Sequence, residues 1–250
     1  MKKKISILKI INDSLSSIHE NINSIILSSF PLLAIYIFEF FIKSFEHNME
    51  KFEYHIILSI CSILASISFI YLSIMTHRII INGSSFNRSS SSSSGFDGVL
   101  SYILRLLSLI LITFLLFSVS LFIVMSIFWS GFGQKSLNAL NIGILIAMLP
   151  TMGIISQIVI VLPSTINLSG GITFRTAILS CEGIRKEVFI LVGLLPIACS
   201  IVLKYILSGD NNIVLEFVSY VITLLLWIIQ LAILTSLYEY LEEHKYIPFE

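Results

Sequence analysis

The sequence predicts an all-α, polytopic membrane protein whose six transmembrane helices form one bundle. Of its 250 residues 56% are hydrophobic and 12% are charged, about half the charged fraction of a soluble domain. Six apolar stretches come close to the roughly 20 residues that a helix needs to cross a ~30 Å hydrocarbon core. The six stretches are 25–42, 56–75, 106–129, 139–162, 188–203 and 213–238. Together with two amphipathic segments, 1–23 and 171–186, they predict a single integral membrane domain over 1–250.

Lysine and arginine are distributed unevenly between the segments that flank these spans. The N-terminal segment, the second and fourth loops and the C-terminal tail together hold 11 of the 15 basic residues, and the other three loops hold four. Because basic residues concentrate on the cytoplasmic side of a membrane, this pattern predicts that both termini are cytoplasmic. An even number of spans agrees with that orientation.

The N-terminal segment 1–23 combines a basic start with one apolar stripe. Such a helix can lie in the cytoplasmic headgroup layer, attracted by anionic lipid, or it can pack against the other helices. Polar residues between 12 and 24 and the length of the first apolar stretch argue against a signal peptide, so we expect an uncleaved first helix. The stripe residues recur every three or four positions: Leu8, Ile11, Leu15, Ile18 and Ile22.

The first span contains a carboxylate, Glu39, near its outer end. Lys43 follows four residues later, which places both side chains on one face of a helix. The favoured interpretation is an ion pair that anchors the helix end at the interface. A carboxylate in a membrane helix is costly, so the alternative is a group that lines an ion or solute pathway.

Serine residues mark the second span and the loop that follows it. Ser62 and Ser66 have the small-xxx-small spacing that lets two membrane helices approach closely, so a packing seam is favoured over the lining of a polar pore. Residues 82–98 are rich in serine and glycine and predict a flexible cytoplasmic loop.

Prolines and one amide distinguish the fourth and fifth spans. Pro150 removes a backbone hydrogen bond near the middle of the fourth span and predicts a kink. Broken helices can line transporter sites, but a packing role is favoured. Gln157 is expected to form a hydrogen bond to a neighbouring helix, and Pro196 interrupts the fifth span. Gly143 and Ala147 predict a close helix seam.

The fourth loop predicts a second interfacial helix over 171–186. Pro163 ends the preceding span, and a turn cluster follows it. A helix here would carry charged residues on one side and an apolar stripe on the other. The stripe comprises Phe174, Ala177, Ile178, Cys181 and Ile184, and the charged residues are Arg175, Glu182, Arg185 and Lys186.

The sequence lacks the residue patterns of membrane enzymes. Its five histidines, among them His77 directly after the second span, are scattered and form no HExxH motif. The three cysteines form no CxxC pair, which argues against a disulfide framework and against a zinc site. No phosphate-binding loop or dinucleotide-binding glycine pattern is present. We therefore expect no enzymatic activity, no catalytic residue, no cofactor and no metal.

Around the fourth loop the chain has an aliphatic run, 158–163, that ends in Leu-Pro, then Ala177 in the predicted interfacial helix and the step Ser180-Cys181-Glu182-Gly183, and a tyrosine, Tyr238 or Tyr240, stands at the last helix end. In these features the chain resembles the bacterial inner-membrane proteins of the glycerophosphodiester phosphodiesterase membrane-domain-like family, which includes YciC-like proteins. The resemblance implies an integral inner-membrane protein. It implies no phosphodiesterase activity, because that activity belongs to a separate soluble domain.

Two functions follow as hypotheses from these observations. The leading hypothesis is a non-enzymatic protein of the bacterial inner membrane, a scaffold or partner subunit in envelope maintenance. Its expected partners are membrane lipid and other membrane proteins, with no nucleic acid. The alternative is a small-solute or lipid transporter, or a permease subunit. The candidate structural or pathway residues are Glu39, Pro150, Gln157, Pro163, Gly183 and Pro196.

Overall fold

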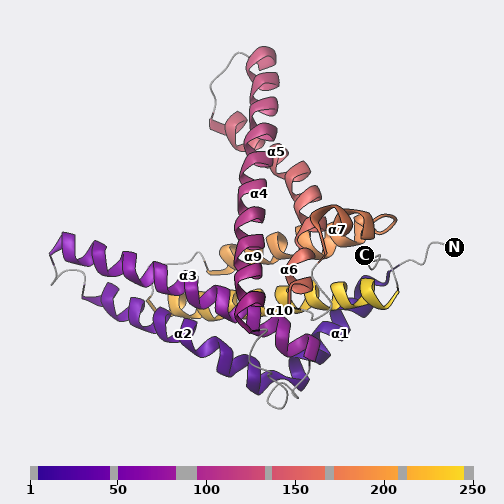
Figure 1. Ribbon diagram of the computed structural model, residues 1–250. Coiled ribbons are helices and arrows are strands. Elements are labelled where there is room, and N and C mark those ends of the chain that lie inside the picture. Colours follow the sequence, from indigo (N-terminus) through magenta and orange to yellow (C-terminus); the bar gives the residue numbers. More distant parts are fainter. Residues whose placement is uncertain are drawn as a thin grey trace. The chain divides into compact units, whose positions relative to one another are not determined.

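The computed structural model describes residues 5–45, 50–82, 95–132, 137–166, 172–207 and 213–244. Within these ranges the regular structure is helical throughout and includes no β-strand. The helices are α1 (Ile7–Glu20), α2 (Ile22–Ser44), α3 (Lys51–Asn82), α4 (Gly95–Phe132), α5 (Leu137–Ile158), α6 (Val161–Ser164), α7 (Phe174–Ser180), α8 (Arg185–Val188), the π-helix η3 (Phe189–Leu194), α9 (Leu195–Leu207) and α10 (Ile213–Glu243). Figure 1 labels most of them.

Six of the helical stretches are long and apolar enough to cross a membrane, which confirms the predicted fold class and identifies a multi-pass membrane protein. Several helices extend beyond the apolar stretches of the sequence. A backbone hydrogen-bond ladder does not require apolar side chains, so a membrane helix can continue past the hydrocarbon core. The candidate spans are Ile22–Ser44, Lys51–Ile81, Gly98–Ile127, Ile146–Ser164, Arg185–Leu203 and Phe217–Glu243.

The chain divides into two compact units. The first unit contains α4 to η3 and the last residues of α10, and the second contains nearly all of α1, then α2, α3, almost all of α9 and most of α10. Four helices are divided between the units: α1 after Ile7, α4 after Gly95, α9 after Leu195 and α10 after Leu237.

In the second unit, α2 and α3 form an antiparallel hairpin, and α10 packs with it (Figure 1). Phe69 of α3 meets Trp227 of α10 edge to face, with ring centroids 5.3 Å apart. Between membrane helices such contacts act through close packing rather than through the removal of surface from water. The buried core residues are Ile25, Leu32, Leu72, Ile79, Leu224 and Ile228.

In the first unit, α5 packs close to α4 at Gly143. A Cβ atom added there would lie 3.2 Å from Sδ of Met125, and Ala147, one turn along α5, is fully buried. The predicted seam at these two positions is confirmed. Gly193 of η3 also lies against α5, since a Cβ atom added to it would lie 3.6 Å from Cε of Met152.

The two amphipathic segments differ from their predictions in detail. The helix predicted over 171–186 ends at Ser180, and a turn with Gly183 at φ 94° separates α7 from α8. Its stripe faces inward, with Ala177, Cys181 and Ile184 buried. In α1 the buried positions are Ile10 and Ser14, whereas Leu8 and Leu15 of the predicted stripe are exposed, as is Ile22 at the start of α2.

The serine seam predicted on the second span is wrong for the part of the chain that the structure describes. Ser62 and Ser66 are exposed, and each hydroxyl donates a hydrogen bond to the carbonyl four residues earlier in α3. Most of the predicted flexible loop 82–98 lies outside the described residues. Its end is helical, because α4 begins at Gly95.

Candidate functional site

The six candidate residues from the sequence are spread over both units. Glu39 and Pro196 belong to the second unit and the other four to the first. Pro150 is an exposed residue inside α5, and Pro163 is buried in α6. Gly183 lies in the turn after α7. Pro196 is the second residue of α9, and α9 directly follows the π-helix η3. A π-helix pairs residues five apart, which suits a segment where proline offers no amide hydrogen.

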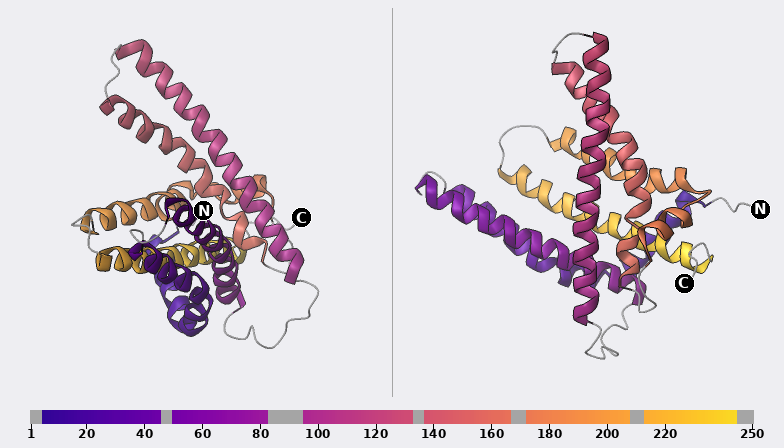
Figure 2. Two further views of the ribbon diagram at one scale, coloured as in Figure 1. Left: turned by 90° about the vertical axis from the view of Figure 1, so that its left-hand side faces the viewer. Right: turned by 45° about the horizontal axis from the view of Figure 1, so that its top comes forward.

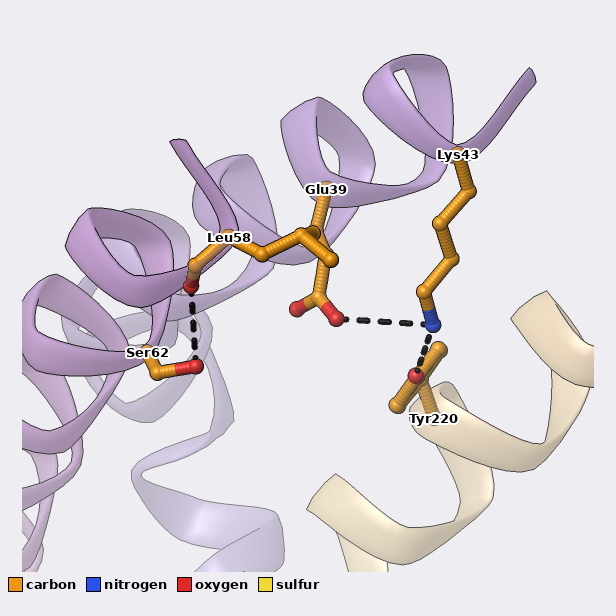
Figure 3. A network of polar contacts seen from close by, with 5 residues as sticks. All are labelled: Glu39, Lys43, Leu58, Ser62 and Tyr220. Atoms are coloured by element: carbon orange, nitrogen blue, oxygen red, sulfur yellow. Dashed lines mark hydrogen bonds and ion pairs between the residues drawn. The ribbon is translucent and has the colours of Figure 1, made fainter. Parts of the chain in front are cut away.

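The predicted ion pair of the first span is confirmed, and it has a further partner. Nζ of Lys43 lies 3.4 Å from Oε1 of Glu39 and donates a hydrogen bond of 3.0 Å to the hydroxyl of Tyr220 on α10 (Figure 3). The Tyr220 ring also stacks on Tyr36 of α2, with centroids 5.0 Å apart. The lysine therefore links α2 to α10 through one ionic and one neutral partner.

The prediction that Gln157 bonds to a neighbouring helix is wrong. Its Nε2 donates a 2.6 Å hydrogen bond to the carbonyl of Gly153, one turn earlier in α5. Thr151 does the same in this helix, because its hydroxyl donates to the carbonyl of Ala147. In a medium without water, a polar side chain needs a hydrogen-bond partner from the protein. The backbone carbonyl one turn earlier in the same helix is within reach without any movement of the helix, so such side chains bond to their own helix.

A polar contact that the sequence did not reveal joins His77 of α3 to Thr235 of α10. Both side chains are fully buried, and Nδ1 of His77 lies 2.6 Å from Oγ1 of Thr235. The predicted second span ends at Met75, whereas α3 continues to Asn82. The signal that could have found it is the run of Ile79, Ile80 and Ile81, which continues the apolar pattern of the helix beyond the histidine.

The hydrogen bonds of Thr235 favour one tautomer of His77. The hydroxyl of Thr235 donates to the carbonyl of Leu231 at 2.8 Å, so its oxygen is an acceptor toward His77. A neutral His77 therefore carries its hydrogen on Nδ1 and presents Nε2 as an acceptor. An ionisable side chain buried in a membrane helix with a specific partner is a candidate functional residue.

Two more hydroxyls are buried at the level of this pair. Oγ1 of Thr76 on α3 and Oγ of Ser236 on α10 form no hydrogen bond to the residues that the structure describes. Ser73, one turn earlier on α3, differs from them because its hydroxyl donates to the carbonyl of Phe69 at 2.9 Å. We call Thr76, His77, Thr235 and Ser236 the α3–α10 polar cluster.

In the first unit, Arg105 of α4 connects the end of α6 to the start of α7. Its Nη1 donates to the carbonyl of Ile172 at 2.8 Å and lies 3.4 Å from Oγ of Ser164. The Ser164 hydroxyl, directly after Pro163, accepts from the amide of Ile172 and donates to the carbonyl of Val161. This network joins the end of α6 to the residues directly before α7. Burial raises the pKa of Cys181 in the same loop to about 12, so its thiol is unreactive.

The surface between α2 and α3 contains an apolar hollow of about 250 Å³. A small-molecule site normally adds a few convergent polar groups that orient the ligand, and in this lining the single polar group is the thiol of Cys61. We therefore assign it no solute. Its lining residues are Ala34, Ile35, Phe38, Ile57, Ile60, Cys61 and Leu64.

The contacts described above between distant segments involve three ionisable groups, Lys43, His77 and Arg105, and each of them bonds to a neutral group of a distant segment. No group of three or more His, Cys, Asp or Glu side chains that could hold a metal ion occurs among the described residues. The chain matches no protein family, no curated protein and no solved structure. The resemblance to YciC-like proteins therefore stays a prediction from the sequence.

Proposed function

We propose that this chain is a non-enzymatic membrane protein that acts as a scaffold or partner subunit, and that α4 carries the surface for its partner. The supporting observation is the exposure of α4. Buried residues make up 6% of the most apolar window of the span Gly98–Ile127, the lowest share among the six spans. Large side chains such as Phe114 and Phe122 are about three-quarters exposed.

The exposed residues of α4 follow the spacing of a helix-packing seam. Leu100, Leu104, Leu107, Leu111 and Phe114 are alternately four and three residues apart, and all five are exposed. This period keeps one stripe facing a neighbouring helix along its length, as in left-handed helix pairs. By contrast, the ionisable groups described above are engaged inside their own units. The surface, rather than an internal polar site, is therefore the feature available to a partner.

We further propose a bacterial inner-membrane location with both termini in the cytoplasm. The supporting observations are the concentration of lysine and arginine in alternate segments and the even number of candidate spans. We also propose that the chain belongs to the YciC-like family, on the basis of the sequence motif given above.

A transporter or permease subunit for a small solute or lipid is the second candidate. The α3–α10 polar cluster supports it, because polar and ionisable side chains inside membrane helices often mark solute or proton pathways. Two of the candidate pathway residues are engaged elsewhere, Gln157 with its own helix and Glu39 with Lys43. Solute uptake into vesicles that contain the purified protein would favour this candidate over the first.

Site-specific photo-crosslinking in native membranes tests the partner surface. A photoreactive amino acid at Leu107 or Phe114 is expected to capture a second polypeptide. The matched control is Ile63 of α3, which is as exposed as Leu107, at 61% and 63%. Capture of lipid alone at all three positions, together with purification of the protein as a lone particle after mild detergent extraction, would contradict the proposal.

A further inference from the structure

We propose that the α3–α10 polar cluster holds a buried water molecule, which bridges the hydroxyls of Thr76 and Ser236 beside the His77–Thr235 pair. The inference concerns the interior of the second unit and is independent of the partner surface on α4. It begins with two hydroxyls that are at least nine-tenths buried and have no hydrogen-bond partner among the described residues.

The geometry places both hydroxyls on the same side of the α3–α10 seam. Figures 1 and 2 show that α3 and α10 run in the same direction, and the contact between His77 and Thr235 fixes their facing positions. Each residue turns an α-helix by about 100°. One step back from His77 to Thr76 and one step forward from Thr235 to Ser236 therefore turn toward the same side.

The chemistry of the cluster suits water better than an ion. A hydroxyl both donates and accepts, so the hydroxyls of Thr76 and Ser236 can each donate a hydrogen bond to one water or accept one from it. A buried water typically makes two to four hydrogen bonds to otherwise unsatisfied groups. None of the four side chains carries a fixed negative charge, so a cation would lack a counter-ion. A hydroxyl without any partner in a dry interior would be destabilising.

A double-mutant cycle tests whether one molecule joins the two hydroxyls. The variants are Thr76→Val, Ser236→Ala and the double variant, each unfolded reversibly in mixed detergent micelles. If one water bridges both groups, each single substitution lowers the folding equilibrium constant several-fold, and the second adds little to the first. Additive effects, or two neutral single substitutions, would overturn the bridge.

Solid-state NMR of the ¹⁵N-histidine-labelled protein in bilayers tests hydration directly and does not depend on stability. The spectrum of His77→Gln identifies the His77 resonances, and exposed His19 serves as the hydrated control. We expect the Nδ1–H tautomer and fast magnetisation transfer from water to the His77 ring, and we expect that transfer to disappear in the double variant. The absence of transfer in the unmodified protein would show a dry cluster and overturn the proposal.

Discussion

Substituting Thr235 by valine should weaken the interaction between α3 and α10 and leave the shape of the core almost unchanged. Valine has nearly the volume of threonine but offers no oxygen to His77. The change removes an acceptor that lies 2.6 Å from Nδ1 and leaves the imidazole N–H in a fully buried position. It also removes the hydroxyl's bond to the carbonyl of Leu231, but that carbonyl keeps its place in the helix.

Two magnitudes bound the expected loss. A buried donor left without a partner costs about 1–3 kcal/mol in soluble proteins, whereas hydrogen bonds between membrane helices average about 0.6 kcal/mol and reach about 1.7 kcal/mol. Because both partners are fully buried and the contact is short, we expect a loss of about 1–2 kcal/mol for Thr235→Val. This corresponds to a roughly 5–30-fold change in the folding equilibrium.

Reversible unfolding in mixed detergent micelles measures this loss, and Thr113→Val is the matched control. Thr113 on α4 is half-buried, and its hydroxyl donates to the carbonyl of Leu109, so this control removes the same kind of intrahelical bond without a cross-helix partner. We expect it to change the free energy of unfolding by less than about 0.5 kcal/mol. Equal effects of the two substitutions would refute the assignment of the His77–Thr235 contact as a stabilising link.

Three further predictions follow from the packing and the charges. Gly143→Leu should destabilise the first unit, because the new side chain meets Met125 at close range. Gly153→Leu should be tolerated, since nothing lies within 4 Å of a Cβ atom added there. Thermal unfolding of the two variants measures the difference. Lys43→Met should cost about 1 kcal/mol or more in detergent unfolding, because its partly buried carboxylate partner loses its counter-charge, and a neutral result would show that the pair is solvated. Cys181 should resist maleimide up to about pH 9, because its raised pKa keeps the thiol protonated and a thiolate forms only as the pH approaches 12; rapid labelling in the folded protein would contradict its burial.

The sequence predicted the spans well because membrane helices must be apolar over a length that the bilayer determines. Their ends were predicted less well, since hydropathy reports depth in the membrane and not where the backbone ladder stops. The clearest case is α3, which passes through Thr76, His77 and Arg78 and continues to Asn82. The shorter fourth-loop helix has a local cause, because Gly183 adopts a positive φ that ends regular helix.

The same distinction holds for the contacts of the candidate site. Contacts within one helix could be predicted from the sequence, and contacts between distant helices could not. The Glu39–Lys43 pair could be predicted, because helix periodicity alone places residues four apart on one face. The links from Lys43 to Tyr220 and from His77 to Thr235 join residues 177 and 158 positions apart, and no local spacing encodes such a contact. The prediction for Gln157 was wrong for the opposite reason, because the acceptor nearest to its side chain is a carbonyl of its own helix.

The most direct test of the central claim, a chain that crosses the bilayer six times with both ends on one face, is cysteine accessibility in intact bacterial cells. Single substitutions Ser6→Cys, Glu50→Cys and His244→Cys in a variant without native cysteines would be exposed to a membrane-impermeant maleimide. The account predicts labelling at position 50 in intact cells, and labelling at positions 6 and 244 only after the membrane is opened. Labelling of the two terminal positions from opposite sides, or recovery of the protein in the soluble fraction, would contradict it.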